Sequence, residues 1–159
     1  MSNLKSSLDW CLASEKRMRR IQGNNALAIE HINKAKHNLI AADYSTKGNF
    51  DDWAVCQTYY AMYHSLLAIL FKKGFESKNH ACTINAIEYL IDTKQINFSK
   101  DDLLFIRTAE QMTEKDAKSL REEFQYGTKT QVNKVLLSNL IQRAKEIVEK
   151  VEIILNEIP

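Results

Sequence analysis

The sequence predicts an all-α fold, an up-and-down antiparallel bundle of five or six helices. Helix breakers are few, because the only proline is the final residue and the four glycines all lie between segments of helical periodicity. No segment alternates apolar and polar residues with an enrichment in β-branched side chains, so we expect no strands. Long helices joined by short connections favour a bundle.

The first two predicted helices occupy the N-terminal third of the chain. An irregular apolar stripe predicts a helix from about Asn3 to Gln22, and residues 1–23 are expected either to pack with the bundle or to form an added arm. The second helix is predicted from about Asn24 to Thr46, and an asparagine at its start can cap it. Its apolar positions recur at helical spacing: Ile29, Ile32, Ala35, Leu39 and Ala42.

The third predicted helix, Asp51 to Lys73, is the centre of the bundle. It begins with two aspartates and ends with two lysines, the order that suits the helix dipole, and Gly74 ends it. Residues 53–71 contain no charged side chain, yet they hold too many polar groups for a membrane span. A helix without charge on any face is expected to be surrounded by other helices.

Three further helices complete the predicted bundle. The fourth is expected from His80 to Thr93 with Asn79 as its cap, and the fifth from Ser99 to Gly127. The sixth is expected to start at Thr128, where Thr-Lys-Thr-Gln has capping-box spacing, and to continue to Ile158. Without a linker or repeat, we expect one domain over residues 1–159.

Composition limits the function classes only loosely. The formal net charge of +2 is too small to indicate nucleic acid by itself. The three cysteines are far apart in the sequence, so we expect reduced thiols rather than a disulfide framework, in a cytoplasmic protein. The first residues lack the basic and apolar pattern of a signal peptide. The densest basic cluster, residues 16–20, is interpreted as a solvated helix end or as a phosphate contact.

The central and fourth helices contain a recognisable pattern. Residues 57–64 read Gln-Thr-Tyr-Tyr-Ala-Met-Tyr-His, and a Lys-Gly turn and Lys78-Asn79-His80 follow. This pattern resembles the HEPN superfamily (higher eukaryotes and prokaryotes nucleotide-binding), with a weaker match from about Ala26 to Ile158. The resemblance implies a helical bundle that dimerises through its central helices and associates with nucleic acid.

Catalytic HEPN proteins cut RNA without a metal through an Arg-x4-6-His motif, in which the histidine moves a proton and the arginine neutralises phosphate charge. In this chain the corresponding arginine looks like Arg121, and Tyr126 stands where the histidine would be expected. A tyrosine is a poor base at neutral pH. The resemblance therefore implies an RNA- or nucleotide-binding homodimer in a two-component, toxin–antitoxin-like system with a minimal nucleotidyltransferase.

Two alternatives stay open. One is a metal-independent ribonuclease with a degenerate site, in which Arg121 stabilises the transition state and His80 or His64 replaces the missing histidine. The other is a non-catalytic interaction protein that docks a partner helix on its long sixth helix.

Each candidate binding residue also has a purely structural interpretation. Tyr60 and His64 share a helix face and either line a polar groove or pack in the bundle. Lys78 and His80 stand where a helix start can receive an anion, or they are a solvated loop lysine and a first-turn histidine. The complete candidate set is Tyr60, His64, Lys78, His80, Arg121 and Tyr126.

Arg121 and Tyr126 are expected near the end of the fifth helix. They either contact a phosphate and a base, or they are an arginine suited to a helix C-terminus and a tyrosine packed over the turn. No His-Glu-x-x-His or Glu-x-x-His occurs, and the glycines are isolated. We therefore expect no metal and no cofactor, whereas residue counts leave a Ser/His or Cys/His nucleophile open.

Overall fold

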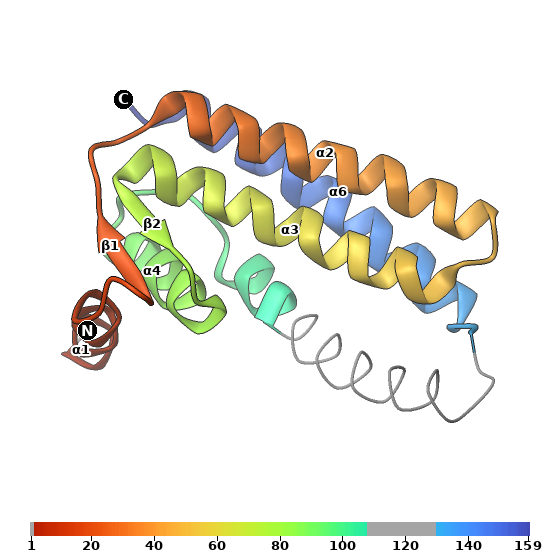
Figure 1. Ribbon diagram of the computed structural model, residues 1–159, viewed down its shortest axis with the longest axis horizontal. Helices are drawn as coiled ribbons and strands as arrows, with labels where there is room; N and C mark the ends of the chain where they lie inside the picture. The colour runs from red at the N-terminus through yellow and green to blue at the C-terminus, as the bar shows by residue number, and fades with distance from the viewer. Residues whose placement is uncertain (1, 108–129) are drawn as a thin grey trace.

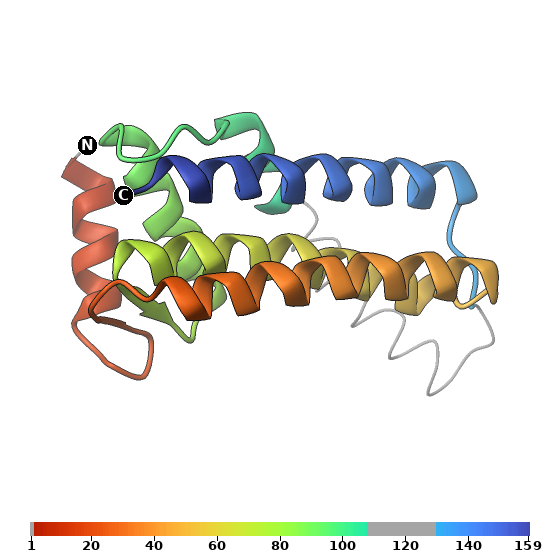
Figure 2. The ribbon, with the colours of Figure 1, turned by 90° about the horizontal axis from the view of Figure 1, so that it is seen from above.

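The computed structural model describes residues 2–107 and 130–159, and most of them are helical. The elements in chain order are α1 (Ser2–Leu12), β1 (Met18–Arg20), α2 (Asn25–Lys47), α3 (Asp51–Lys73), β2 (Phe75–Ser77), α4 (His80–Asp92) and α6 (Lys134–Glu157), and residues 100–107 are also helical. The long helices α2, α3 and α6 lie side by side (Figure 1), and α6 packs over the α2–α3 pair (Figure 2). The predicted all-α bundle is confirmed.

The central helix has the predicted bounds. Sixteen of the 23 residues of α3 are buried, which fits the absence of charge along its middle. Gly74 ends the helix in the left-handed conformation with φ of 86°, and a Cβ at this position would lie 2.8 Å from the carbonyl oxygen of Ile21. Only glycine meets both demands without strain.

The two predicted asparagine caps are present. The Asn24 side chain accepts a hydrogen bond from the Leu27 amide at 2.9 Å, and the Asn79 side chain accepts one from the Cys82 amide at 3.0 Å. These bonds satisfy amides that lack a partner in the first helical turn. In α2 one predicted core position is wrong, because Ile29 is 49% exposed.

The N-terminal helix is shorter than predicted, and the prediction of no strands is wrong here. α1 ends at Leu12, and β1 then pairs with β2 in antiparallel register. Hydrogen bonds from the Ile21 amide to the Gly74 carbonyl and from the Lys78 amide to the Arg17 carbonyl extend this pairing. Three residues are too few to show a two-residue period, so this strand depends on a partner distant in the sequence.

The prediction of reduced thiols throughout is also wrong. Cys11 of α1 and Cys82 of α4 form a disulfide across 71 positions of sequence, with their Cα atoms 5.6 Å apart. Both cysteines are fully buried, where α1 packs on α4. Sequence spacing could not indicate this bond, because the folding of two distant helices against each other creates it.

The last helix begins later than predicted. Thr128 lies outside the described residues, Thr130 and Gln131 are not helical, and α6 starts at Lys134. The Asn133 side chain accepts hydrogen bonds from the amides of Val135 and Leu136 at 3.0 and 3.1 Å, so it supplies the cap in place of the capping box.

Two buried carboxylates hold α6 against the rest of the chain. Asp51 accepts a bond from the Lys134 ammonium at 2.8 Å. Asp102, which is 1% exposed, pairs with Arg143 at 2.6 Å and Lys150 at 2.8 Å. Asp51 is the first residue of α3 and Lys134 is the first residue of α6, so the two helices start side by side. They run in the same direction (Figure 1).

Candidate functional site

Six aromatic rings form a continuous row across the middle of the bundle. The row runs from α2 through α3 to α4, and we call it the ring row: His31, His64, Tyr63, His80, Tyr59 and Tyr60. The shortest centroid distance is 4.2 Å, between the stacked rings of Tyr63 and His80. Of the six predicted site residues, Tyr60, His64 and His80 therefore belong to a larger aromatic assembly.

The rings of the ring row differ in their exposure to solvent: two tyrosines are buried, and the other four rings, which we call the rim, are more accessible. Tyr59 and Tyr63 are 3% and 8% exposed, whereas Tyr60 is 44% exposed. The three histidines of the row are partly exposed. Such rings offer flat apolar faces beside polar edges, a combination that can stack a base and bond to it.

His64 pairs with His31 of α2 as the ring row reaches that helix. The two Nδ1 atoms lie 2.9 Å apart, so one ring must be neutral and accept while the other donates. Burial lowers the pKa of His64 to about 4, and nearby His31 and Lys34 add to this effect. Burial also lowers the pKa of His31, against the opposing influence of Glu30. Both rings are therefore neutral near pH 7, where His64 cannot act as a general acid.

His80 turns inward, away from the expected arrangement with Lys78. The Tyr59 hydroxyl and the His80 Nδ1 lie 2.8 Å apart. The Lys78 side chain is exposed, and its backbone amide donates to the Arg17 carbonyl at 2.8 Å. The structure thus brings His80 together with the ring row and places Lys78 on the neighbouring strand pair.

Arg121 and Tyr126 lie outside the described residues. The interpretation of these residues as a phosphate contact and a base contact, and the ribonuclease alternative built on Arg121, therefore stay predictions.

A profile of the HEPN domain matches residues 28–154 of the chain. This protein belongs to the HEPN domain family. Among curated proteins, none matches the chain. The matched segment contains the whole ring row, and the resemblance inferred from the Tyr-Tyr-Ala-x-x-His pattern is confirmed at the level of the family.

Sequence reasoning missed three rings that this HEPN domain brings to the site. Tyr59 and Tyr63 were part of the recognised pattern but were not selected, and His31 stood apart on another helix. Because α2 and α3 have equal lengths around a short loop, their hairpin geometry could have placed His31 near His64. Trp10, which is 55% exposed, lies beside the strand pair and had no sequence signal.

Other chemistries find little support in the described part of the HEPN domain. No group of three or more histidine, cysteine or acidic side chains there could hold a metal ion. Burial, and then the charge of Asp52, raises the pKa of the Cys56 thiol, which makes it a poor nucleophile. In the same residues no helix is long and apolar enough to cross a membrane.

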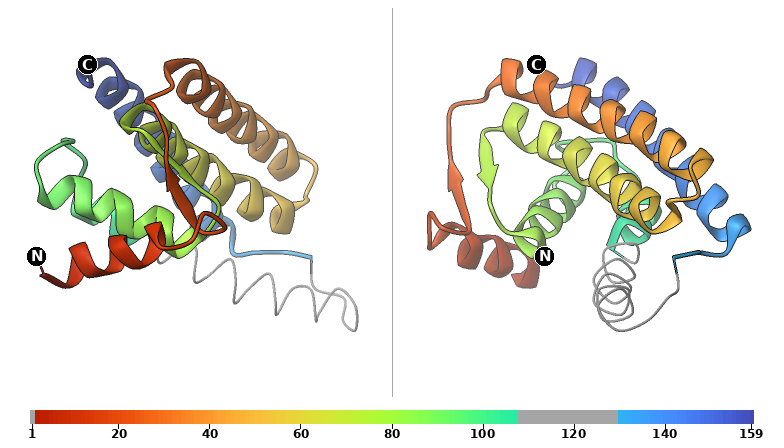
Figure 3. Two further views of the ribbon diagram at one scale, coloured as in Figure 1. Left: turned by 60° about the vertical axis from the view of Figure 1, so that its left-hand side comes forward. Right: turned by 45° about the vertical axis from the view of Figure 1, so that its right-hand side comes forward.

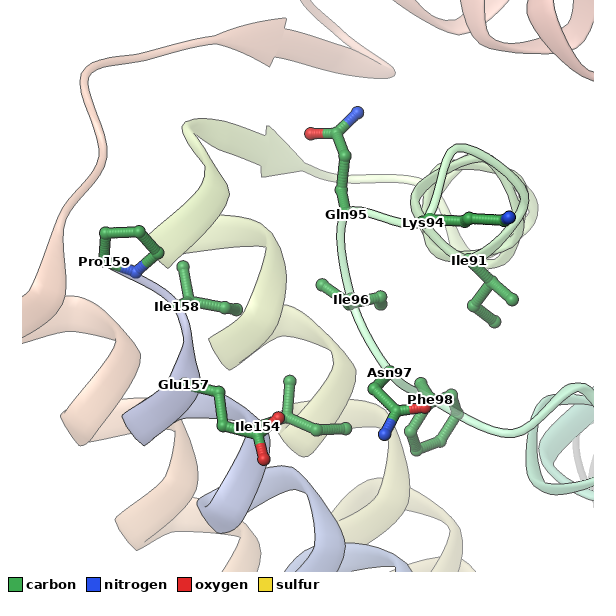
Figure 4. Close-up of a pocket in the computed structure, with 10 residues that line it drawn as sticks. All are labelled: Ile91, Lys94, Gln95, Ile96, Asn97, Phe98, Ile154, Glu157, Ile158 and Pro159. Atoms are coloured by element: carbon green, nitrogen blue, oxygen red, sulfur yellow. The ribbon is translucent and has the colours of Figure 1, made fainter.

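A pocket of about 520 Å³ lies away from the ring row, between the segment after α4 and the C-terminal end of α6. Ile96, Ile154 and Ile158 point toward it (Figure 4). It contains none of the predicted site residues, and its lining mixes apolar and polar side chains. We therefore assign the candidate site of this HEPN protein to the ring row.

Proposed function

We propose that this HEPN protein is a homodimer that binds RNA or a nucleotide at the ring row. The observation that carries the proposal is the row itself, in which Tyr60 and three histidines at the rim surround buried tyrosines. Stacking on aromatic rings contributes about 1–3 kcal/mol for each base and tolerates any base. Neutral histidines can also exchange hydrogen bonds with base edges or ribose hydroxyls.

The proposed dimer uses the exposed face of α3. Trp53 and Tyr60 are 62% and 44% exposed on a helix that is otherwise largely buried, and their spacing of seven places them on one face. Exposed aromatic residues of this kind are enriched at protein interfaces. A dimer through this face would bring two ring rows close to one another, which agrees with the central-helix dimerisation that the family resemblance implies.

The proposed biological setting is a two-component, toxin–antitoxin-like system with a minimal nucleotidyltransferase, in the cytoplasm. The support is the family resemblance. Co-expression with a nucleotidyltransferase encoded by the neighbouring gene should yield a complex of defined mass, and a failure of the two chains to co-purify would remove this partner. The Cys11–Cys82 disulfide removes the argument from reduced thiols, so the proposed cytoplasmic setting rests on the family resemblance alone.

Binding can be tested with a single substitution. Tyr60→Ala should weaken binding of a fluorescent single-stranded RNA about tenfold, because a stacking face is lost. The matched control is Tyr44→Ala on α2, since Tyr44 is 72% exposed and lies outside the row. Fluorescence anisotropy measures both, and light scattering checks that each variant keeps the mass of the wild type, because Tyr60 also lies on the proposed dimer face. Equal affinities for the two variants would remove the ring row as the binding site, and cleavage of the RNA in EDTA would favour the ribonuclease alternative.

A second pair of variants tests the proposed dimer. Trp53→Asp should convert the dimer to a monomer in light scattering, because a charge would be buried at the interface. Ile153→Asp is the control, since Ile153 is 60% exposed on α6. A monomeric wild-type protein would contradict the dimer directly.

A further inference from the structure

The charge of the protein is concentrated on two segments that the fold brings together. Residues 13–22 and 72–78 hold seven basic and two acidic side chains, so they carry +5, whereas the remaining chain carries −3. The basic residues are Lys16, Arg17, Arg19, Arg20, Lys72, Lys73 and Lys78. Pairing of β1 with β2 places these two segments side by side (Figure 3). Positive charge is therefore concentrated in these two neighbouring segments of a nearly neutral chain.

We call residues 16–20 and 75–78 the basic ribbon. Its register continues one pair beyond the strands, because the Lys78 amide donates to the Arg17 carbonyl at 2.8 Å. Arg17 thus stands directly opposite Lys78. Like charges in opposite positions of a strand pair destabilise it. A bound anion would relieve this repulsion.

The ribbon offers little charge compensation of its own. Glu76 forms an ion pair with Arg19. Within the described residues, no carboxylate pairs with Lys16, Arg17 or Lys78, and the same is true of Arg20. Elsewhere two buried carboxylates, Asp51 and Asp102, pair with basic side chains. Among the described residues, four of the five basic side chains of the ribbon therefore have no acidic partner.

Aromatic rings lie beside one end of this surface, where Arg17 faces Lys78. The Arg17 guanidinium lies 3.8 Å from the ring centroid of Trp10, which is 55% exposed. At the same end, His80 follows Lys78 by two positions and stacks on Tyr63. Positive charge beside stacking rings is typical of surfaces that bind single-stranded nucleic acid, and it favours RNA over an acidic polypeptide.

One strand of the ribbon belongs to the matched HEPN domain, and the other strand precedes it. β1 precedes residue 28, where the HEPN match begins, whereas β2 lies within the match. Only Met18 of β1 is buried, so the core does not require arginines at the other two positions of this strand. The positive charge of β1 is therefore not required by the core.

We propose that the basic ribbon binds the phosphate backbone of a single-stranded RNA whose bases reach the ring row. This inference rests on the proposed function. It adds that the ligand is a polynucleotide rather than a free nucleotide, and that the strand runs from the basic ribbon to the ring row. Phosphate contacts position the strand, and the rings take up its bases.

The test compares two double substitutions of exposed lysines in the full-length protein. Lys16→Gln with Lys78→Gln removes two ribbon charges, and Lys47→Gln with Lys94→Gln removes two elsewhere. Affinity for a single-stranded RNA of about 15 nucleotides is measured over a range of salt concentrations. Each lost phosphate contact lowers the slope of log affinity against log salt by about 0.7, so the ribbon variant should lose about 1.4 and bind about tenfold more weakly at low salt.

Adenosine monophosphate serves as the second probe, and its affinity should be the same in wild type and ribbon variant. An unchanged slope for the ribbon variant, with Tyr60→Ala still weakening RNA binding, would overturn the ribbon and leave the proposed function standing. Equal losses in both lysine variants, or equal binding of polyglutamate, would also overturn it. If the wild type binds neither probe, both proposals fail.

Discussion

Helices α3 and α1 are held in place by different means. α3 buries sixteen side chains among three other helices, so its position follows from apolar packing along its whole length. Of the described side chains of α1, only Leu8 and Cys11 are buried, and α1 packs chiefly on α4. Packing energy grows with buried apolar area, so α1 needs other constraints. The disulfide and the β1–β2 pairing provide them.

This difference separates a self-supporting bundle from an attached N-terminal unit. The bundle coincides with most of the HEPN match, and the unit of α1 and β1 precedes it. The proposed ring row therefore stands on the part of the molecule that apolar packing holds together. The basic ribbon depends on the attachment, and its geometry is expected to respond to the state of Cys11 and Cys82.

The largest loss of stability is expected when the disulfide between α1 and α4 is removed. Cys11→Ser with Cys82→Ser should lower the free energy of unfolding by about 4 kcal/mol, because the bond restricts a long loop of the unfolded chain. Chemical denaturation measures this value. Cys56→Ser is the control, since Cys56 is a free thiol. Wild-type protein in dithiothreitol should match the double variant, and identical midpoints before and after reduction would contradict the prediction.

Packing of the bundle gives the next effect. Leu66→Ala should cost about 3 kcal/mol, because the side chain is fully buried in α3 and its truncation leaves a cavity. Leu104→Ala removes the same atoms from a side chain that is 59% exposed, and it should change stability by less than about 0.5 kcal/mol. Equal costs at the two sites would mean that α3 is not the packed centre.

A smaller effect is expected at the edge of the bundle, where Asp102 joins residues 100–107 to α6. Asp102→Asn should lower the free energy of unfolding by about 2 kcal/mol, because bonds between the carboxylate and two basic side chains weaken. Asp101→Asn, one position earlier and exposed, is the control and should be close to neutral. Urea denaturation at neutral pH distinguishes them, and a neutral Asp102→Asn would contradict the assigned role.

The smallest expected effect concerns the contact between α2 and α3. Folding lowers the pKa of His64 to about 4, so the folded state takes up a proton less readily than the unfolded state. The stabilisation is fully present above pH 6.5 and is lost as the pH falls toward 4. Because the ring is only half buried, screening by solvent reduces the effect, and we expect about 1 kcal/mol.

Stability measured from pH 7.5 to 4.5 checks this expectation. His64→Asn should flatten the decline, whereas the control His37→Asn, at an exposed position of α2, should leave it unchanged. Parallel pH profiles for wild type and His64→Asn would exclude a contribution from the histidine pair.

The sequence was most informative where local rules and tertiary packing agree. The bounds of α3 followed from charge order and from Gly74, and both asparagine caps were predicted because capping acts within one helical turn. Predictions failed where the partner is distant, as for β1 and Cys11. At the start of α6 the failure was local, because Asn133 caps the helix in place of the predicted capping box. At the site the Tyr-Tyr-Ala-x-x-His pattern marked the right helix, but it did not indicate His31.

By itself the sequence determined the helical class, the central position of α3 and membership of the HEPN family, because periodicity, caps and a local motif are encoded within single helices. Only the tertiary structure decided that six rings form one row, that Arg17 faces Lys78, and that Cys11 reaches Cys82. These features join segments far apart in the chain. Their proximity results from packing of the whole bundle, which no local pattern records.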